Sequence, residues 1–375
     1  MKIGIVGGTF DPIHNGHLML GEYAKRQYAL DEIWYMPNGN PPHKENASIV
    51  SSVQDRVEMV SLAIAGISDF KLQLFEVEHE EVHYSYQTMA HFRKAYPEHQ
   101  FFFVLGADSL FQLEKWVHPE LLLKECTILA AFRDEVSEDK MQAQIAYLNQ
   151  KYGGDIRLLN TPNIDVSSSE IRKKFECSVS IKNEVPLPVY AYLHLKQLLP
   201  KKRFIHTMGV VHTARDLAIR YGQDIAKAML AALLHDCAKG IPAEKRIALC
   251  KDYELEVSAS EQMNAELLHA KLGAQLAKSH YGVSDAEILD AIRYHTTGRP
   301  KMTFLDKIIY IADYIEPNRK DAPNLKRMRE LAFVDIEQCL YCILEQSLAY
   351  LKTKNEVIDP MTEQTYFYYK SLLKE

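Results

Sequence analysis

The stretch GGTFDPIHNGHL, residues 7–18, directly follows the apolar run Ile3-Gly4-Ile5-Val6. The apolar run predicts a strand, and the residues beyond it predict a turn into a helix. Two glycines at the end of a strand let backbone N–H groups approach a ligand closely, and a helix N-terminus adds partial positive charge there. The stretch therefore predicts a phosphate-binding opening.

Two histidines within this stretch, His14 and His17, lie three residues apart with Gly16 between them. Imidazoles placed this way can donate to phosphate oxygens and stabilise the charge that builds up as a phosphoryl bond breaks. A surface turn that contains two histidines would explain the stretch equally well if it stood alone. The pattern that follows in the chain favours the functional interpretation.

The length of 375 residues exceeds what a single hydrophobic core usually supports, so two domains are expected. Hydrophobic residues at 47% and charged residues at 25% are ordinary for a globular protein. The net charge of −6 and the pI near 6.2 argue against a general binder of nucleic acid or anionic membranes. Small phosphorylated ligands need only a local positive pocket and stay compatible with this charge.

The six cysteines are scattered, and the one close pair, Cys339 and Cys342, has no second pair to complete a four-thiolate metal site. Reduced cysteines in a cytosolic protein are the expected state. No apolar run reaches membrane-spanning length, and the chain starts with a strand pattern instead of a signal peptide. A cytoplasmic location is therefore expected.

Short apolar runs alternate with helical patterns through the first 175 or so residues, which predicts an α/β, Rossmann-like domain with a parallel sheet and helices on both faces. The expected strands span residues 2–6, 32–36, 71–77, 101–105, 127–131 and 156–159. Ligands of such sheets bind outside the carboxyl ends of the strands. Informative residues should therefore follow each strand.

Such residues are present. The second strand is followed by the loop PNGNPPHK, which ends in Lys44, and the fourth is followed by Gly106-Ala107-Asp108. Arg133 follows the fifth strand, and VSSSEIR, residues 166–172, follows the sixth. Serines at a helix start can cap the helix and offer hydroxyls to an anion, with Arg172 one turn further on. An isolated serine cap would indicate helix initiation alone, but this one ends the sheet that begins with HNGH.

These motifs, together with Trp116, resemble the bacterial nicotinate-nucleotide adenylyltransferase family over about residues 1–199. The resemblance implies transfer of AMP from ATP to nicotinate mononucleotide with Mg²⁺, releasing pyrophosphate and giving deamido-NAD. The implied catalytic residues are His14, His17, Lys44 and Arg172. The implied nucleotide-binding residues are Gly7, Gly8, Thr9, Phe10, Gly106, Asp108, Arg133, Ser168 and Ser169.

Tyr84, Ser85 and Trp116 match the family positions that hold the pyridine ring. The sequence departs from the family pattern at Gln87, where an acidic residue is expected; this leaves the predicted helix start around Ser85 intact. A core or interface role explains Trp116 about as well as stacking on a pyridine ring.

The polar stretch from residue 176 and the prolines Pro186 and Pro188 indicate the end of the first domain, followed by a helical pattern over residues 189–199. We therefore expect domains at residues 1–199 and 200–375. Nearly every segment of the second domain has helical periodicity, which predicts an all-α domain. A catalytic site there must be built from side chains projecting inward from different helices.

Six histidines and aspartates of this domain lie in apolar helical contexts, where they are costly to bury unless something binds them. They are His206, His235, Asp236, His269, His295 and Asp313. A single buried histidine is more often structural, but six such positions are hard to explain in that way. Four imidazoles and two carboxylates suit two transition-metal ions and the hydrolysis of phosphate esters or anhydrides. In contrast, His194, His212 and His280 are expected to be structural or exposed.

The motifs RFIHTMGV, LLHDCAKGIP, LLHAKLGA, RYHTTGRPKM and DKIIYIADYIEPNR resemble HD-domain symmetrical diadenosine tetraphosphate hydrolases over about residues 200–352. The resemblance implies a di-iron centre on the six residues above and cleavage of diadenosine tetraphosphate to two ADP, with Asp236 and Lys239 in catalytic positions. It also implies phosphate or nucleotide contacts by Lys239, Thr297, Arg299 and Arg319. Each of these four could equally be a solvated surface residue.

The sequence thus predicts a bifunctional enzyme that acts on ATP, nicotinate mononucleotide and diadenosine tetraphosphate. No nucleic-acid or membrane partner is expected, and the sequence is compatible with a homo-oligomer. Two alternatives stay open for the second domain. It could hydrolyse another nucleotide, such as a guanosine polyphosphate alarmone or a nucleoside monophosphate. It could instead be a nucleotide-sensing regulatory module, although all six ligand positions being filled argues against a decayed site.

Overall fold

The computed structural model of the protein describes residues 1–39, 49–79, 84–132, 137–162, 166–320, 322, 324–354 and 357–372. The chain divides into two compact units, Met1–Tyr190 and Ala191–Glu375. Helix α9 (Leu187–Leu198) contains this division, and the domain boundary expected after residue 199 stays a prediction.

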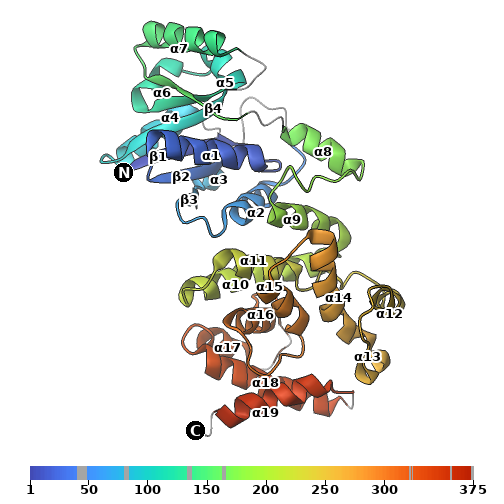
Figure 1. Ribbon diagram of the computed structural model, residues 1–375. Coiled ribbons are helices and arrows are strands. Elements are labelled where there is room, and N and C mark those ends of the chain that lie inside the picture. The colour runs from blue at the N-terminus through green and yellow to red at the C-terminus, as the bar shows by residue number, and fades with distance from the viewer. Residues whose placement is uncertain are drawn as a thin grey trace. The chain divides into compact units, whose positions relative to one another are not determined.

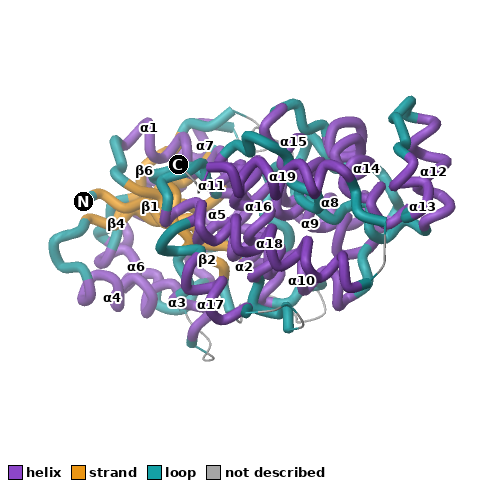
Figure 2. The backbone as a smooth tube through the Cα atoms, turned by 90° about the horizontal axis from the view of Figure 1, so that it is seen from below, coloured by secondary structure: helices purple, strands orange, loops and turns teal. Residues whose placement is uncertain are grey.

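The first unit contains a six-stranded parallel sheet in the order β3-β2-β1-β4-β5-β6 (Figures 1 and 2). The strands are β1 (Lys2–Gly8), β2 (Glu32–Pro37), β3 (Phe70–Leu72), β4 (Gln100–Gly106), β5 (Thr127–Ala131) and β6 (Ile156–Leu159). This order confirms the predicted Rossmann-like class. The chain runs outward from β1 to β3 and then returns to β4 on the other side of β1, which creates the crevice where such sheets bind ligands.

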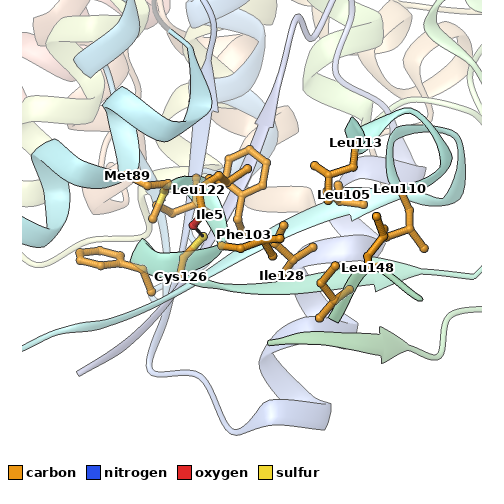
Figure 3. Close-up of a cluster of buried hydrophobic side chains, with 14 of the residues drawn as sticks. Ile5, Met89, Phe103, Leu105, Leu110, Leu113, Leu122, Cys126, Ile128 and Leu148 are labelled. Atoms are coloured by element: carbon orange, nitrogen blue, oxygen red, sulfur yellow. Dashed lines mark hydrogen bonds between the residues drawn. The ribbon is translucent and has the colours of Figure 1, made fainter. Parts of the chain in front are cut away.

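Helices cover both faces of this sheet. They are α1 (Asn15–Tyr28), α2 (Val53–Ile64), α3 (Phe75–Glu78), α4 (Ser85–Ala95), α5 (Ala107–Phe111), α6 (Pro119–Glu125), α7 (Glu138–Tyr152) and α8 (Ser168–Glu176). On one face, Ile5 and Phe103 pack in a buried cluster with Met89 of α4 and Leu122 of α6 (Figure 3). On the other, the hydroxyl of Tyr35 donates to a carbonyl of α1. Successive side chains of a strand point to opposite faces of the sheet, so each strand contacts helices on both faces. These contacts anchor the helices and thereby the loops at the strand ends.

The third strand is shorter than predicted: it ends at Leu72 instead of residue 77. The strand lies at the edge of the sheet, and its last rung is the bond from the Gln73 N–H to the carbonyl of Tyr35 (2.9 Å). The side-chain oxygen of Gln73 then accepts the N–H of Phe75 (3.1 Å), which begins helix α3. An apolar run alone does not reveal this local competition between side chain and sheet.

The second unit is helical, and its described residues contain no strand, which confirms the predicted all-α class (Figure 1). Its helices after α9 are α10 (Lys201–Arg220), α11 (Ile225–Leu234), α12 (Ala243–Asp252), α13 (Ala259–Met263), α14 (Leu268–Leu276), α15 (Ala286–Tyr294), α16 (Phe304–Ile315), α17 (Leu325–Leu331), α18 (Ile336–Thr353) and α19 (Pro360–Leu372). Helix α11 packs against α10, α15 and α16, helix α16 also packs against α10 and α15, and α14 packs on α15. Among the described helices of the whole chain, none has the length and apolar character to cross a membrane.

Candidate functional site

A pocket of about 410 Å³ lies at the carboxyl ends of β1 and β4 in the first unit. Nine of the residues predicted from the sequence line it: Gly7, Gly8, Thr9, His17, Tyr84, Ser85, Gly106, Asp108 and Trp116. They come from segments more than 100 residues apart along the chain. The fold therefore brings five predicted nucleotide-binding residues and all three predicted pyridine residues to one pocket, whereas Phe10, Ser168, Ser169 and Arg172 do not line it.

His17 is oriented by the backbone at the start of α1. The N–H of His14 donates to Nδ1 of His17 (3.2 Å), and the two imidazole rings stack with their centroids 3.6 Å apart. Because Nδ1 accepts this bond, neutral His17 carries its proton on Nε2. His17 can thus act as a hydrogen-bond donor inside the pocket, whereas His14 is buried and borders a smaller cavity beside it.

Phe10 does not line the pocket, although the sequence resemblance placed it among the nucleotide-binding residues. Its side chain is 1% exposed, and its ring packs edge-on against the ring of His17 at a centroid distance of 5.0 Å. A Cβ atom at Gly8 would lie 3.1 Å from the Phe10 ring, so this glycine lets the aromatic ring fit beneath the loop. Phe10 therefore supports His17 and the loop from inside the protein.

Ser168, Ser169 and Arg172 lie in the first two turns of α8, as predicted, and this helix start is tied to the loop before His14. The hydroxyl of Ser168 donates to the carbonyl of Pro12 (3.0 Å). The guanidinium of Arg172 donates to the carbonyl of Asp11 and lies 3.7 Å from its buried carboxylate. Two other predicted residues, Lys44 and Arg133, lie outside the described residues.

Tyr84 and Ser85 form the start of α4, with Tyr84 as the capping residue. The side-chain oxygen of Gln87 accepts the N–H of Tyr84 (3.2 Å), so the departure from the family pattern at this position leaves the helix start intact, as expected. Trp116 borders the pocket and packs edge-on against Phe103 of β4 at a centroid distance of 6.4 Å.

Arg56 of α2 is a residue that the sequence interpretation missed. It is 1% exposed and donates to the carbonyl of Thr9 (2.8 Å), the side chain of Asn38 (3.3 Å) and the carbonyl of Gly39 (3.3 Å). It therefore joins the loop after β1 to the loop after β2. An arginine within a helical pattern looks in sequence like a solvated residue, so no signal identified it.

Glu76 is a second missed residue of this pocket. The hydroxyl of Thr88, which is fully buried, donates to Oε1 of Glu76 (2.8 Å). Burial raises the pKa of the Glu76 carboxyl to about 7, and the bond from Thr88 offsets only part of this increase. A carboxyl with this pKa changes its charge close to neutral pH.

We expect Glu76→Gln to stabilise the first unit above pH 7. The pKa of Glu76 is about 7 in the folded protein and 4.5 ordinarily, so its contribution to stability is full below pH 4.5 and is lost as the pH rises through 7. Glutamine cannot ionise, so the variant should gain roughly 1–2 kcal/mol over the wild type at pH 8 and almost nothing at pH 4.

Urea denaturation followed by tryptophan fluorescence measures this gain, because both tryptophans, Trp34 and Trp116, lie in the first unit. Glu78→Gln on the same short helix is the matched control, since Glu78 is exposed. Parallel pH profiles for wild type and Glu76→Gln would contradict the prediction.

In the second unit, the carboxylate of Asp236 is the centre of the predicted metal cluster. Its Oδ1 lies 3.3 Å from Nε2 of His269 and 3.7 Å from Nε2 of His295. Its Oδ2 lies 3.6 Å from Nε2 of His235 and 4.0 Å from Nε2 of His206. All four predicted histidines thus face one carboxylate.

Asp313 completes the set, with its Oδ1 at 3.1 Å from Nε2 of His206. The described residues contain two groups of potential metal ligands, and within each group the ligand atoms all lie within 4.8 Å of one another. The first is His206, His235 and Asp313, and the second is His235, Asp236 and His295. His194, His212 and His280 belong to neither group found among the described residues, and neither does the predicted ligand His269. His269 differs from the other three because its Nε2 faces Asp236.

Backbone carbonyls orient three of the histidines. Nδ1 of His235 donates to the carbonyl of Ala232 (2.6 Å), and Nδ1 of His295 donates to that of Ile292 (2.7 Å). His269 makes the same contact with the carbonyl three residues before it. With the proton held on Nδ1, the lone pair on Nε2 faces the cluster, which is the arrangement of metal-ligating histidines.

The ionisation states also fit metal binding. Nε2 of His235 is buried and makes no hydrogen bond to the described residues. Burial lowers the pKa of His269 to about 3, so its imidazole is neutral at pH 7. Burial alone would raise the pKa of Asp236, but the neighbouring His235 and His295 hold it well below its ordinary value. Burial likewise lowers the pKa of His235, whereas hydrogen bonds with Asp313 and Glu316 outweigh burial and raise the pKa of His206 to about 9. Neutral imidazoles beside an ionised carboxylate, as at His269 and Asp236, suit a transition-metal site, and His206 must lose its proton to join it.

The other predicted contacts of this unit differ in their placement. Lys239 lies beside the cluster, with Nζ 3.3 Å from Nδ1 of His269, and Arg319 donates to Oδ1 of Asp313 (2.8 Å). Arg299 forms ion pairs of 2.8 Å with Asp290 and Asp306, and Thr297 donates to the next carbonyl. The structure therefore brings Lys239 and Arg319 to the ligands but engages Thr297 and Arg299 elsewhere.

Glu316, which the sequence interpretation missed, orients the fourth histidine. It is 1% exposed and accepts a hydrogen bond from Nδ1 of His206 (3.1 Å). A side chain thus orients His206, whereas backbone carbonyls orient His235, His269 and His295. Orientation by a side chain can be altered by substitution.

We expect Glu316→Gln to weaken metal binding by about 10-fold to 100-fold, because a neutral amide holds and polarises the His206 imidazole less than a carboxylate does. Competition with a chromogenic chelator measures the affinity. Glu330→Gln, at an exposed position of the same unit, is the matched control. Equal metal affinity in both variants would show that Glu316 does not support the ligand.

Comparisons with known proteins match the two halves of the chain to different families. The cytidylyltransferase-like family matches residues 5–174, and the HD domain family matches residues 203–318. A protein of Mycoplasma genitalium named "Probable nicotinate-nucleotide adenylyltransferase/Ap4A hydrolase" is 31% identical over 328 residues, which cover 85% of this chain and 88% of that protein.

Two relatives each match one half of the chain. The "Bis(5'-nucleosyl)-tetraphosphatase, symmetrical" of Bacillus subtilis is 45% identical over 172 residues, 46% of this chain and 91% of that protein. The "Probable nicotinate-nucleotide adenylyltransferase" of Lachnoclostridium phytofermentans is 38% identical over 192 residues, 51% of this chain and 96% of that protein. With a relative of the same two-part organisation matched over most of its length, the chain belongs to the family of nicotinate-nucleotide adenylyltransferase/Ap4A hydrolases.

Proposed function

We propose that the two activities of this bifunctional enzyme are divided between its units, with adenylyl transfer in the pocket of the first unit and hydrolysis of diadenosine tetraphosphate (Ap4A) at the cluster around Asp236. The chain is a nicotinate-nucleotide adenylyltransferase and a symmetrical bis(5'-nucleosyl)-tetraphosphatase. The assignment of sites rests chiefly on one observation: predicted residues far apart in sequence meet at one pocket and at one ligand cluster.

In the first unit, the phosphate of nicotinate mononucleotide attacks the α-phosphorus of ATP and pyrophosphate leaves. No covalent protein group is needed, so the protein contributes position and charge stabilisation. We assign the donor Nε2–H of His17 to the phosphates of ATP, and the N-terminus of α8 with Arg172 to the departing pyrophosphate. Mg²⁺ would neutralise charge on the phosphates.

The pyridine end is assigned to Tyr84, Ser85 and Trp116. Ser85 is the first residue of α4, whose N-terminal backbone N–H groups carry partial positive charge. This environment favours a carboxylate over a neutral amide, which supports nicotinate over nicotinamide mononucleotide as the substrate. The aromatic ring of Trp116 supplies a surface on which the pyridinium ring can stack.

In the second unit, we propose that the six ligands hold two transition-metal ions, with iron as the metal implied by the sequence resemblance. Such ions supply a hydroxide at neutral pH and stabilise the negative charge of a phosphoryl group. The carbonyl-bound Nδ1 atoms and Glu316 keep the four imidazoles in position, and Lys239 adds positive charge beside His269. Asp236, whose two oxygens face different histidines, and Asp313 would supply the carboxylate ligands.

The test is product analysis with the full-length, iron-loaded protein and Ap4A, resolved by anion exchange. ADP as the sole product is expected, and removal of iron with a chelator should abolish its formation. ATP plus AMP would contradict symmetrical cleavage. A panel with guanosine polyphosphates and nucleoside monophosphates tests the alternative substrates, and binding without turnover would favour a regulatory module.

The cytoplasmic location stays a prediction, supported by six free cysteines.

A further inference from the structure

A pocket of about 690 Å³ in the second unit opens beside the ligand cluster. Its lining includes His206 and Glu316 on the cluster side and four cationic side chains, those of Lys202, Arg203, Arg319 and Lys320. The cluster itself is largely buried, so this pocket gives solvent and ligands a way to reach His206. Its positive charge suits an anionic ligand of several charges.

Arg203 lies one turn before His206 on α10 and was not identified from the sequence. Its Nη1 donates to Oδ2 of Asp236 at 2.9 Å. The Arg203 side chain is 41% exposed, whereas that of Asp236 is 4% exposed. The guanidinium therefore spans from the buried carboxylate to the open pocket, and its planar set of five N–H donors exceeds what this one contact engages.

Arg319 makes the corresponding contact on the other carboxylate ligand. Its Nη2 donates to Oδ1 of Asp313 at 2.8 Å, and its side chain is 34% exposed. Both arginines line the same pocket. Each of the two ligand carboxylates thus carries a half-exposed guanidinium on its pocket side, and His206 lies between them, 3.1 Å from Asp313 and 4.0 Å from Asp236.

We propose that Arg203 and Arg319 form a guanidinium clamp that binds two neighbouring phosphates of a phosphoanhydride chain, the two that one product ADP keeps after cleavage. This deepens the hydrolase function proposed above and rests on it. Guanidinium groups bind phosphate oxygens through parallel N–H···O bonds, and two of them lining one pocket can engage two phosphates at once.

The clamp defines the substrate class. A chain of two or more linked phosphates reaches both arginines, whereas a nucleoside monophosphate reaches one. The exposed lysines at the pocket rim then add non-specific attraction for the remaining charges of a longer chain. Nucleoside polyphosphates are therefore expected to bind far better than monophosphates.

The experiment compares Arg203→Ala, Arg203→Lys and Arg215→Ala in the metal-loaded, full-length protein. Arg215 is the matched control because it lies on the same helix with a side-chain exposure of 38% and pairs with its neighbour Asp216 outside the pocket. Isothermal titration with ADP and with AMP gives the affinities for two phosphates and for one. Metal content and adenylyl transfer by the same samples report on the ligands and on the fold.

Arg203→Ala should weaken ADP binding by about 10-fold to 100-fold and raise KM for Ap4A, the loss expected for a charged hydrogen-bond partner. AMP binding, metal content and adenylyl transfer should change less than about threefold. Arg203→Lys should recover part of the ADP affinity, since it restores charge without the planar donors, and Arg215→Ala should match the wild type.

Equal weakening of ADP and AMP binding, or unchanged ADP binding, would overturn the clamp. Loss of metal from Arg203→Ala would also overturn it, because Arg203 would then act by holding Asp236. Failure of the proposed hydrolase function would look different. The wild type would then bind ADP through the clamp but would not convert Ap4A to ADP.

Discussion

Asp236→Ala is expected to reduce Ap4A hydrolysis by about 10³-fold or more while leaving adenylyl transfer unchanged. The two oxygens of Asp236 face His269 at 3.3 Å and His235 at 3.6 Å, so its removal takes the central carboxylate out of the candidate ligand set. It also leaves Arg203 without its buried partner. An incomplete ligand set would bind the proposed metal ions more weakly, and the proposed hydrolysis depends on them.

Rates of ADP formation and of deamido-NAD formation on the same sample measure the two activities, and each activity controls for the integrity of the other unit. Asp216→Ala is the matched control, because this aspartate lies on α10 with 48% side-chain exposure. Asp236→Asn should be as inactive as the alanine variant, since a neutral amide lacks the negative charge that a carboxylate would offer a metal ion. Unchanged hydrolysis in Asp236→Ala would remove catalysis from this cluster.

His17→Ala is expected to lower kcat/KM for adenylyl transfer by about 10²-fold to 10⁴-fold. The N–H of His14 occupies Nδ1 of His17, so Nε2 is left as the donor within the pocket. Phe10 and His14 hold the imidazole from two sides, which limits its reorientation when charge develops on the phosphates. Preorganised donors of this kind stabilise a transition state more than a ground state.

Steady-state formation of pyrophosphate measures this effect, with Ap4A hydrolysis as the internal control. His17→Gln places an amide donor near the position of Nε2 and should recover part of the activity. His99→Ala is the control variant, since His99 belongs to the same unit but does not line the pocket. A drop of less than about threefold in His17→Ala would place phosphate stabilisation on other groups.

The sequence by itself determined the two fold classes and most of the chemistry. Apolar runs alternating with helical patterns predicted the parallel sheet, because buried strands between helices leave that signature. The candidate metal ligands, such as His235 and Asp236, stand out because polar residues inside apolar helical runs are costly without a partner. In the first unit, glycines and histidines after β1 indicated a phosphate site from the physics of a strand–helix junction alone.

Only the tertiary structure decided which charged residues are buried and what they face. Arg56, Glu316 and Arg203 occupy helices or helix ends where a charged side chain is ordinarily solvated, so helical periodicity gives no sign of their roles. Glu316 contacts His206 across 110 residues of sequence, and Arg56 contacts Thr9 across 47. Local propensity depends on near neighbours, whereas burial and electrostatic partnership depend on segments that meet only when the chain has folded.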